Sequence, residues 1–392
     1  MAQPDGAIRI LIVDDSVVMR SLLRAVVMTD ARLEVTATAS NGEAGLRAME
    51  TMYPDLVLLD VEMPVMDGLS TLRVMRERGL RVPVIMCSTL THRGAQVTIE
   101  ALASGAADYV AKPSGQPSRE AAVEALARDL VPKILALTMR RSTPSSAPRA
   151  MTSVWPPMVA PSLATEVYGP GAAGWNGTGV AGASPRVVVI GVSTGGPAAL
   201  DLLLPALPKD FPLPVLVVQH MPELFTKLLA ERLDSRCALH VIEAAEGMTV
   251  EAGHVYVAKG NWHLEVHGDG RQGRTRLRLT QAQQENHCRP SVDVLFRTAV
   301  AAYGDAVLGV ILTGMGADGM EGCRLIRAHG GSVLAQDHAT SAVWGMPGAV
   351  AQAGLAQKVL PLQAIAGEVI HLAHRHGGDV TGIEPMRQKW AV

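Results

Sequence analysis

The chain has 392 residues, which is more than one ordinary domain holds and predicts two domains with separate cores. Hydrophobic residues make up 48% of it, and the 35 basic and 37 acidic residues leave a formal charge of −2. This balance excludes a general electrostatic attraction to nucleic acid or to an anionic membrane surface. The chain shows neither a signal-peptide pattern nor an apolar run of bilayer-spanning length, so we expect a cytoplasmic protein that is not embedded in a membrane.

The four cysteines are far apart and form no C-x-x-C pair, so neither zinc binding nor a redox couple is indicated. We expect them to be small apolar residues in a reducing compartment. They are Cys87, Cys237, Cys288 and Cys323.

Short aliphatic runs alternate with segments of helical spacing, such as Val17 to Met28, over the first third of the chain. This alternation predicts a five-stranded parallel sheet with helices on both faces, whose ligands bind beyond the carboxyl ends of the strands. The predicted strands are Ile8 to Val13, Val35 to Ala39, Leu56 to Leu59, Val84 to Cys87 and Ala107 to Val110.

Polar residues follow four of these predicted strands. Any one of them is more simply a helix cap or turn residue, but together they favour a binding site. Three carboxylates in one crevice repel one another unless a hard cation such as Mg²⁺ lies among them. A carboxylate can also accept a phosphoryl group whose oxygens bind Mg²⁺, an ammonium group and a hydroxyl. The residues are Asp14, Asp15, Asp60, Ser88 and Lys112, with Asp60 as the expected acceptor.

The segment from Ile8 to Leu137 resembles the receiver domain of response regulators. The matching motifs are VDDS (13–16), LLDVEMPVMDG (58–68), CST (87–89) and YVAKP (109–113). The resemblance implies a flavodoxin-like fold and a histidine kinase as phosphoryl donor. It also implies a role for each matching residue. Asp60 would be the phosphoacceptor, and Mg²⁺ would be bound by the carboxylates of Asp14, Asp15 and Asp60 and the backbone carbonyl of Glu62. Ser88 would be the switch hydroxyl, Lys112 the phosphate partner and Tyr109 the side chain whose conformation reports the switch. Thr is commoner than Ser at the switch position.

Residues 140–185 are rich in Ser, Pro, Gly and Ala and have no hydrophobic period. Such a composition buries too little apolar surface to offset chain entropy, so it predicts a flexible linker. The expected domains are therefore residues 1–139 and 186–392.

A second alternating region begins at Arg186. The strand-like run Val187 to Ile190 leads into Gly191-Val192-Ser193-Thr194-Gly195, which is a G-x-S-x-G motif and matches neither phosphate-binding glycine pattern, the P-loop or G-x-G-x-x-G. A serine on such a strand-to-helix turn has its hydroxyl raised above the sheet, beside a helix N-terminus that stabilises negative charge. Ser193 is thus a candidate nucleophile.

A serine nucleophile needs a base and an acid that orients the base. The strand-like run Pro214 to Gln219 ends in His220, and Ala306 to Leu312 leads to Asp318, so both side chains are expected at the sheet edge that holds Ser193. Their order along the chain differs from that of α/β-hydrolases. The pattern predicts a doubly wound, mainly parallel sheet with a β-hairpin over 263–280 that turns at 268–270.

Other polar residues have simpler interpretations. Three histidines near the C-terminus could in principle hold a metal, but no carboxylate or Cys lies beside them in sequence, so they are expected at a solvated helix end; they are His371, His374 and His376. Ser291 is expected to begin a helix rather than to act as a second nucleophile.

The segment from Arg186 to His376 resembles the catalytic domain of the protein-glutamate methylesterases of chemotaxis, the CheB family. The motifs GVSTGGP, VVQHMP, RPSVDVLF, LTGMGADG and WGMPGAV match in order. The resemblance implies hydrolysis of glutamate γ-methyl esters on methyl-accepting chemoreceptors, and deamidation of receptor glutamines, with no cofactor in the esterase site. Ser193 would be the nucleophile, His220 the general acid and base, Asp318 its orienting acid, and the Met315 backbone N–H an oxyanion donor.

The fused receiver motivates a hypothesis of regulation, in which the receiver covers the Ser193 edge until Asp60 is phosphorylated. Two other classes compete with the enzyme. A DNA-binding response regulator requires a helix-turn-helix and a basic face, which the sequence lacks. A catalytically silent adaptor would have no need of the three intact triad candidates.

Overall fold

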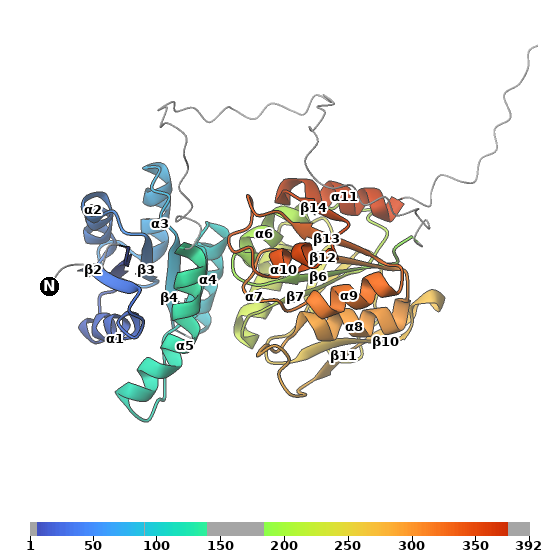
Figure 1. Ribbon diagram of the computed structural model, residues 1–392, viewed down its shortest axis with the longest axis horizontal. Helices are drawn as coiled ribbons and strands as arrows, with labels where there is room; N and C mark the ends of the chain where they lie inside the picture. The colour runs from blue at the N-terminus through green and yellow to red at the C-terminus, as the bar shows by residue number, and fades with distance from the viewer. Residues whose placement is uncertain (1–5, 90, 139–183, 375–392) are drawn as a thin grey trace, which may run out of the picture.

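The computed structural model describes residues 6–89, 91–138 and 184–374, and it has two α/β domains side by side (Figure 1). The N-terminal domain has a five-stranded, all-parallel sheet in the order β2-β1-β3-β4-β5. The predicted strands are confirmed to within two residues. They are β1 Ile8–Val13, β2 Leu33–Ala39, β3 Leu56–Asp60, β4 Val84–Ser88 and β5 Asp108–Ala111, separated by α1 Val17–Val27, α2 Gly42–Met52, α3 Gly68–Glu77 and α4 His92–Ala103 and followed by α5 Arg119–Thr138.

Burial and capping explain why these segments fold as they do. All side chains of β3 and β4 are buried, because helices cover both faces of the sheet. Four helices begin at a residue whose side-chain oxygen accepts a backbone N–H of the first turn, which satisfies a donor that the helix itself leaves free. These residues are Ser16, Asn41, Asp67 and Thr91.

The C-terminal domain has a seven-stranded, all-parallel sheet in the order β14-β13-β12-β6-β7-β9-β8, which confirms the doubly wound fold. Its strands are β6 Val187–Val192, β7 Val215–Gln219, β8 His240–Glu243, β9 His254–Val257, β12 Val307–Ile311, β13 Ser332–Gln336 and β14 Lys358–Leu360. Its helices are α6 Gly196–Leu203, α7 Glu223–Asp234, α8 Val292–Tyr303, α9 Met320–Ala328, α10 Met346–Gln352 and α11 Leu362–His374.

The predicted β-hairpin is present as β10 His263–Asp269 and β11 Arg274–Thr280. Its predicted turn is wrong, because Gly268 and Asp269 still pair with the opposite strand and the chain reverses over 270–273. The Asp269 carboxylate accepts the N–H of Gln272 in this turn, and Gly273 takes the left-handed backbone conformation that closes it.

Some predictions lie outside the described residues, among them most of the linker and His376. His371 and His374 lie exposed at the end of α11, as expected. Among the described residues, no helix is both long enough and apolar enough to cross a membrane.

The domains meet through β5, α4 and α5 of the N-terminal domain and α6 and α7 of the C-terminal domain (Figure 1). The Tyr109 ring at the end of the first sheet stacks on Phe225 of α7, with ring centroids 4.5 Å apart. Tyr109 and Phe225 belong to one buried cluster that runs across the boundary. The carboxyl edge of the second sheet therefore faces the first domain.

Candidate active site

The N-terminal domain brings its predicted acidic residues together at the carboxyl ends of β1 and β3. Ligand oxygens of Asp14, Asp15 and Asp60 lie within 4.8 Å of one another. The Lys112 ammonium lies 2.8 Å from both the Asp14 and the Asp60 carboxylates. Burial raises the pKa of Asp60 to about 6 despite the opposing effect of Lys112. An all-oxygen donor set of this kind suits Mg²⁺.

The other predicted residues of this domain lie around that cluster. Ser88 is buried at the end of β4 and donates its hydroxyl to the Thr89 carbonyl at 3.1 Å. The Glu62 carboxylate is 3.1 Å from Arg93 on the surface. Tyr109 is buried, and it lies against the second domain rather than in solvent.

Ser193 lies on the turn between β6 and α6, as predicted. Its backbone N–H donates to the Thr313 carbonyl at 3.0 Å, and its carbonyl accepts from the Gln219 side chain at 3.0 Å. Gly195 has φ 79°, and a Cβ there would lie 2.5 Å from Cβ of Ala342. The turn is thus tied to both neighbouring strands and requires glycine.

His220 and Asp318 meet at the same edge. The His220 Nε2 atom is 2.8 Å from Asp318 Oδ2. Because Asp318 accepts this hydrogen bond, Nε2 carries the proton in the neutral ring and Nδ1 is left as the base. Burial lowers the pKa of His220, but the contacts with Asp318 and Cys288 outweigh it and raise the pKa to about 9.

Asp318 is buried in a shell of donors that sequence reasoning missed. Its Oδ1 atom accepts from the Asn286 amide and the Ser291 hydroxyl, both at 2.8 Å, and its Oδ2 atom accepts the Val292 N–H at 2.7 Å. Burial raises the pKa of Asp318, but His220 and the donors of Val292 and Asn286 outweigh it and lower the pKa to about 2. Asp318 is therefore a carboxylate at neutral pH. Ser291 does begin α8, but its hydroxyl binds Asp318 instead of capping the helix.

The fourth group of the site is Cys288. Its Sγ atom is 3.7 Å from His220 Nδ1, so the prediction of a merely apolar role does not hold for this cysteine. Among the described residues, no hydrogen bond joins the Ser193 hydroxyl to the imidazole. Ser193, His220 and Cys288 all line one cavity of about 720 Å³.

The N-terminal domain forms part of that cavity's wall, with residues of β5 and α5. The Asp108 carboxylate accepts a hydrogen bond of 2.6 Å from the hydroxyl of Thr194, the residue after Ser193. Lys133 of α5 lies 3.7 Å from Asp108 and donates to the Tyr109 carbonyl at 2.8 Å. Burial would lower the pKa of Lys133, but Asp108 and Asp129 raise it, so it remains an ammonium group.

Met315 lies on the wall of the same cavity. A Cβ on the preceding residue, Gly314, would be 2.7 Å from Cβ of Ser193, so this loop runs directly beside the serine. The Met315 side chain packs against a buried cluster made mainly of N-terminal-domain residues. The loop is therefore in contact with both domains.

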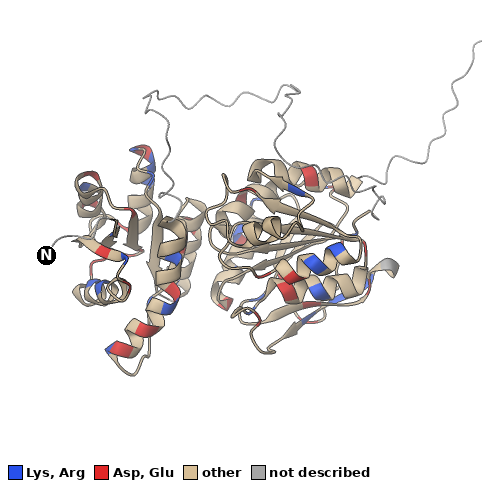
Figure 2. Ribbon diagram, viewed as in Figure 1, with Lys and Arg blue, Asp and Glu red and all other residues tan. Residues whose placement is uncertain are grey.

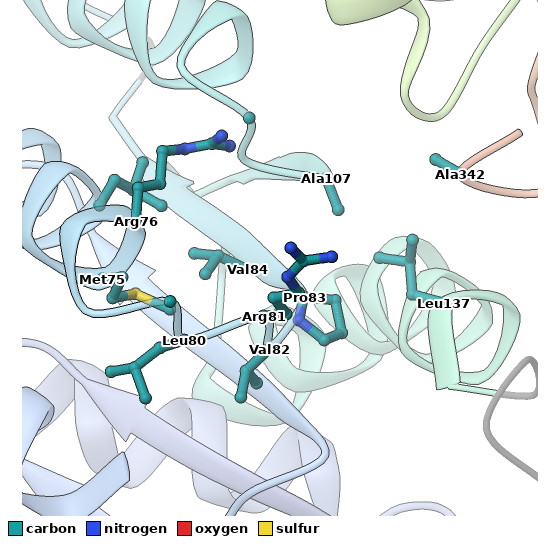
Figure 3. A pocket seen from close by; sticks show the side chains of 13 residues that line it. Met75, Arg76, Leu80, Arg81, Val82, Pro83, Val84, Ala107, Leu137 and Ala342 are labelled. Atoms are coloured by element: carbon teal, nitrogen blue, oxygen red, sulfur yellow. The ribbon is translucent and has the colours of Figure 1, made fainter. Parts of the chain in front are cut away.

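A second cavity, of about 700 Å³, lies at the amino end of β4. Figure 3 shows Arg76 on one side of this cavity and Leu137 and Ala342 on the other, with Arg81 between them in this view. The described residues that line it include no acid, histidine or cysteine. Basic and acidic residues are interspersed over both domains in the view of Figure 2.

Both halves of the chain match known families. Residues 10–124 match the response regulator receiver domain, and residues 188–369 match the CheB methylesterase domain. A protein from a Nocardioides species named protein-glutamate methylesterase/protein-glutamine glutaminase is 50% identical over 364 residues, which are 93% of this chain and 94% of that protein. A Trichodesmium erythraeum protein of the same name is 43% identical over 92% of this chain and 98% of its own length.

Among solved structures, the CheB methylesterase catalytic domain of Thermotoga maritima is 45% identical, with a TM-score of 0.47 over 48% of this chain and all of that chain. The full-length relatives match both domains in one polypeptide and are named for an enzymatic activity, which does not favour the adaptor hypothesis. The chain therefore belongs to the CheB family of protein-glutamate methylesterases, with a receiver domain ahead of the catalytic domain.

Proposed function

We propose that the chain hydrolyses γ-methyl esters of glutamate side chains on methyl-accepting chemoreceptors, with Ser193 as nucleophile, His220 as general acid and base and Asp318 as the acid that orients His220. The 2.8 Å bond between His220 and Asp318, one strand away from the Ser193 turn, is the observation that carries this proposal. The same residues would deamidate receptor glutamines, because both reactions are acyl transfers to an alcohol.

In the first half-reaction Ser193 attacks the γ-carbonyl carbon while Nδ1 of His220 takes the hydroxyl proton. The tetrahedral intermediate then collapses, and His220 returns the proton to the departing methanol. Water, deprotonated by the same nitrogen, then attacks the acyl-enzyme, and His220 returns the proton to the Ser193 oxygen as the glutamate side chain is released. Asp318 stabilises the imidazolium in both halves without itself taking the proton.

The Ser193 hydroxyl must reach Nδ1, which contacts Cys288 in the resting arrangement. Ser193 and His220 line the same cavity, so a rotation of the Ser193 side chain with a small shift of the ring would join them. The developing oxyanion would be stabilised by the Met315 N–H, on the loop that runs beside Ser193.

In the receiver domain, Asp60 would be the phosphoacceptor, with a histidine kinase as donor. Mg²⁺ would be held by Asp14, Asp15, Asp60 and the Glu62 carbonyl, and when bound it neutralises phosphoryl oxygens. Lys112 would pair with the phosphoryl group in place of its present pairing with the Asp60 carboxylate, while the Ser88 hydroxyl would donate to it.

Phosphorylation would relieve occlusion of the esterase site. Asp108, Tyr109 and Lys133 form part of the cavity wall, so a receptor helix cannot enter over that side while the domains are docked. Tyr109 is the side chain whose conformation would change when Asp60 is phosphorylated, and its movement would disrupt the ring stacking on Phe225. The equilibrium would then shift toward an open arrangement.

We take the receiver domain as residues 1–139, the linker as 140–185 and the catalytic domain as 186–392. A cytoplasmic location is consistent with all four cysteines being free thiols.

The direct test measures methanol release from methylated receptor by the full chain with a phosphodonor, with Ser193→Ala as control. An active wild type and an inactive variant support the esterase. Equal release by both would refute it, and phosphorylation-dependent binding without release would revive the adaptor.

A further inference from the structure

The thiol of Cys288 has an environment that the esterase reaction does not use. Thiol, imidazole and carboxylate lie in a row, with Cys288 Sγ 3.7 Å from one nitrogen of His220 and Asp318 2.8 Å from the other. This is the arrangement that activates a cysteine by proton transfer to an oriented base. The serine of the esterase mechanism and this thiol therefore compete for the same nitrogen.

The backbone holds the thiol at this position. Glu285 and Cys288 exchange two backbone hydrogen bonds, of 3.2 and 2.9 Å, across a tight turn. The two residues between them, Asn286 and His287, have φ of 54° and 62°, in the left-handed region. The Asn286 side chain further ties the turn to Asp318 at 2.8 Å. The thiol and the imidazole are thus anchored to the same carboxylate.

In the described parts of the chain, no histidine is recorded in contact with any of the remaining cysteines. Cys87 and Cys323 are fully buried, and burial raises the pKa of each thiol. Cys237 is partly exposed, but burial and then the charges of Asp201 and Asp234 raise its pKa to about 11. Cys288 is half-buried on the wall of a cavity of about 720 Å³, ample for a peroxide molecule little larger than a water of about 30 Å³.

We propose that Cys288 is a site of reversible oxidation by hydroperoxides, and that its sulfenic acid switches off the esterase. In this step Nδ1 of His220 takes the thiol proton, and the thiolate attacks one peroxide oxygen. An S–O bond forms as the O–O bond breaks, so sulfur loses two electrons and the peroxide gains them. The leaving hydroxide takes the proton from the imidazolium and departs as water.

The loss of activity follows from the position of the new oxygen. The S–OH group lies against Nδ1 and fills the space through which the Ser193 hydroxyl must approach, so the base is withdrawn from the reaction. This part rests on the proposed role of His220, whereas the reactivity of the thiol does not. A thiol reductant restores the free cysteine and with it the base.

The test treats the full chain with hydrogen peroxide, removes the excess with catalase and measures ester hydrolysis relative to the same protein untreated. Parallel samples contain dimedone, which traps sulfenic acids, and are mapped by mass spectrometry. Cys288→Ser is the test variant, and Cys237→Ser is the matched control because Cys237 is the other partly exposed thiol.

We expect wild type and Cys237→Ser to lose about 100-fold in rate, the usual contribution of a general base, and to recover with dithiothreitol. After peroxide treatment, Cys288→Ser should hydrolyse the ester at the same rate as its own untreated sample. In the wild type, dimedone should label Cys288. Equal inactivation of Cys288→Ser, or label on Cys237 in place of Cys288, would overturn the proposal. If the untreated chain hydrolyses no ester, the proposed function fails, while the dimedone map still decides whether Cys288 is the oxidation site.

Discussion

His220 is held between a carboxylate and a thiol, and this determines which of its nitrogens can act. Asp318 accepts the hydrogen bond from Nε2, so in the proposed mechanism the proton from Ser193 must arrive at Nδ1. Apart from His220, the groups that donate hydrogen bonds to the Asp318 carboxylate come from the turn over 285–288 and the start of α8. The chemistry of the site therefore depends on neutral hydrogen-bond donors as much as on the three reacting residues.

The pH dependence of the esterase follows from the raised pKa of His220. A raised pKa means that the base form is populated only at higher pH, so kcat/KM should rise about tenfold per pH unit and level off near pH 9. Replacement of Cys288 by Ala removes one contact that raises the pKa and should move the rise to lower pH. A profile of the wild type that is already flat at about pH 7, as for an ordinary imidazole, would contradict this assignment.

Asp318→Asn should be severe but less so than loss of the nucleophile. The amide can still contact Nε2, but it no longer stabilises the imidazolium and can impose the wrong tautomer. We expect kcat to fall about 100- to 10,000-fold, against about a millionfold for Ser193→Ala. Steady-state rates of the two variants provide the comparison, and an Asp318→Asn variant with near-normal kcat would exclude Asp318 from the triad.

At the scale of elements, the N-terminus of α8 is built around Asp318. Backbone N–H groups of Val292 and Asp293 point at its carboxylate, where the helix dipole also favours negative charge. Asp318 itself follows β12, which lies next to the central strand, β6. These donors at the start of α8 stabilise a carboxylate that is almost completely buried.

Ser291→Ala tests this element. Removal of the hydroxyl leaves a buried carboxylate oxygen with one donor fewer, which should lower the free energy of unfolding of the catalytic domain by about 1–3 kcal/mol. The matched control is Ser235→Ala at the exposed end of α7, whose hydroxyl donates to the Arg232 carbonyl. Because this hydrogen bond is exposed, its loss should change stability by less than about 0.5 kcal/mol. Denaturant unfolding of both variants makes the measurement, and equal stabilities would show that Ser291 contributes nothing to the carboxylate's environment.

At the scale of the whole molecule, the receiver contacts the esterase site directly. Asp108 of β5 binds Thr194, the residue after Ser193, and Tyr109 stacks on Phe225 of α7. These contacts come from the strand that leads to Lys112, the ion-pair partner of Asp60, which is the proposed phosphoacceptor. A structural change at Asp60 could therefore reach the turn that holds Ser193 through the contacts of Lys112, Asp108 and Thr194.

Asp108→Ala should weaken the docked arrangement. Loss of the hydrogen bond to Thr194, with a net value of about 0.5–1.5 kcal/mol, should raise the esterase rate without phosphodonor by about two- to tenfold. Asp60→Asn should keep the low basal rate and lose its response to a small-molecule phosphodonor. The measurement compares the esterase rates of wild type, Asp108→Ala and Asp60→Asn with and without phosphodonor. An unchanged basal rate in Asp108→Ala would mean that the contact between Asp108 and Thr194 does not hold the domains together.

Much of the fold was predictable because local chemistry determines it. Aliphatic runs that alternate with segments of helical spacing predict a parallel sheet. The residues that follow β1, β3, β4, β6 and β7 must then lie at the carboxyl edges of the two sheets. The G-x-S-x-G turn requires Gly195 for its positive φ, which is a property of the residue itself. The predicted hairpin turn was misplaced by two residues. Gly and Asp are typical turn residues, but Gly268 and Asp269 pair with the opposite strand of the hairpin.

The sequence by itself determined two α/β domains, the acid cluster around Asp60 and the three residues proposed for catalysis, because side chains at strand ends of a parallel sheet converge whatever lies between them. Only the tertiary structure decided that Cys288 contacts His220, that Asn286 and Ser291 hold Asp318, and that Asp108 binds Thr194. These contacts join loops and domains whose approach depends on packing over the whole molecule, and no local period or motif encodes that approach.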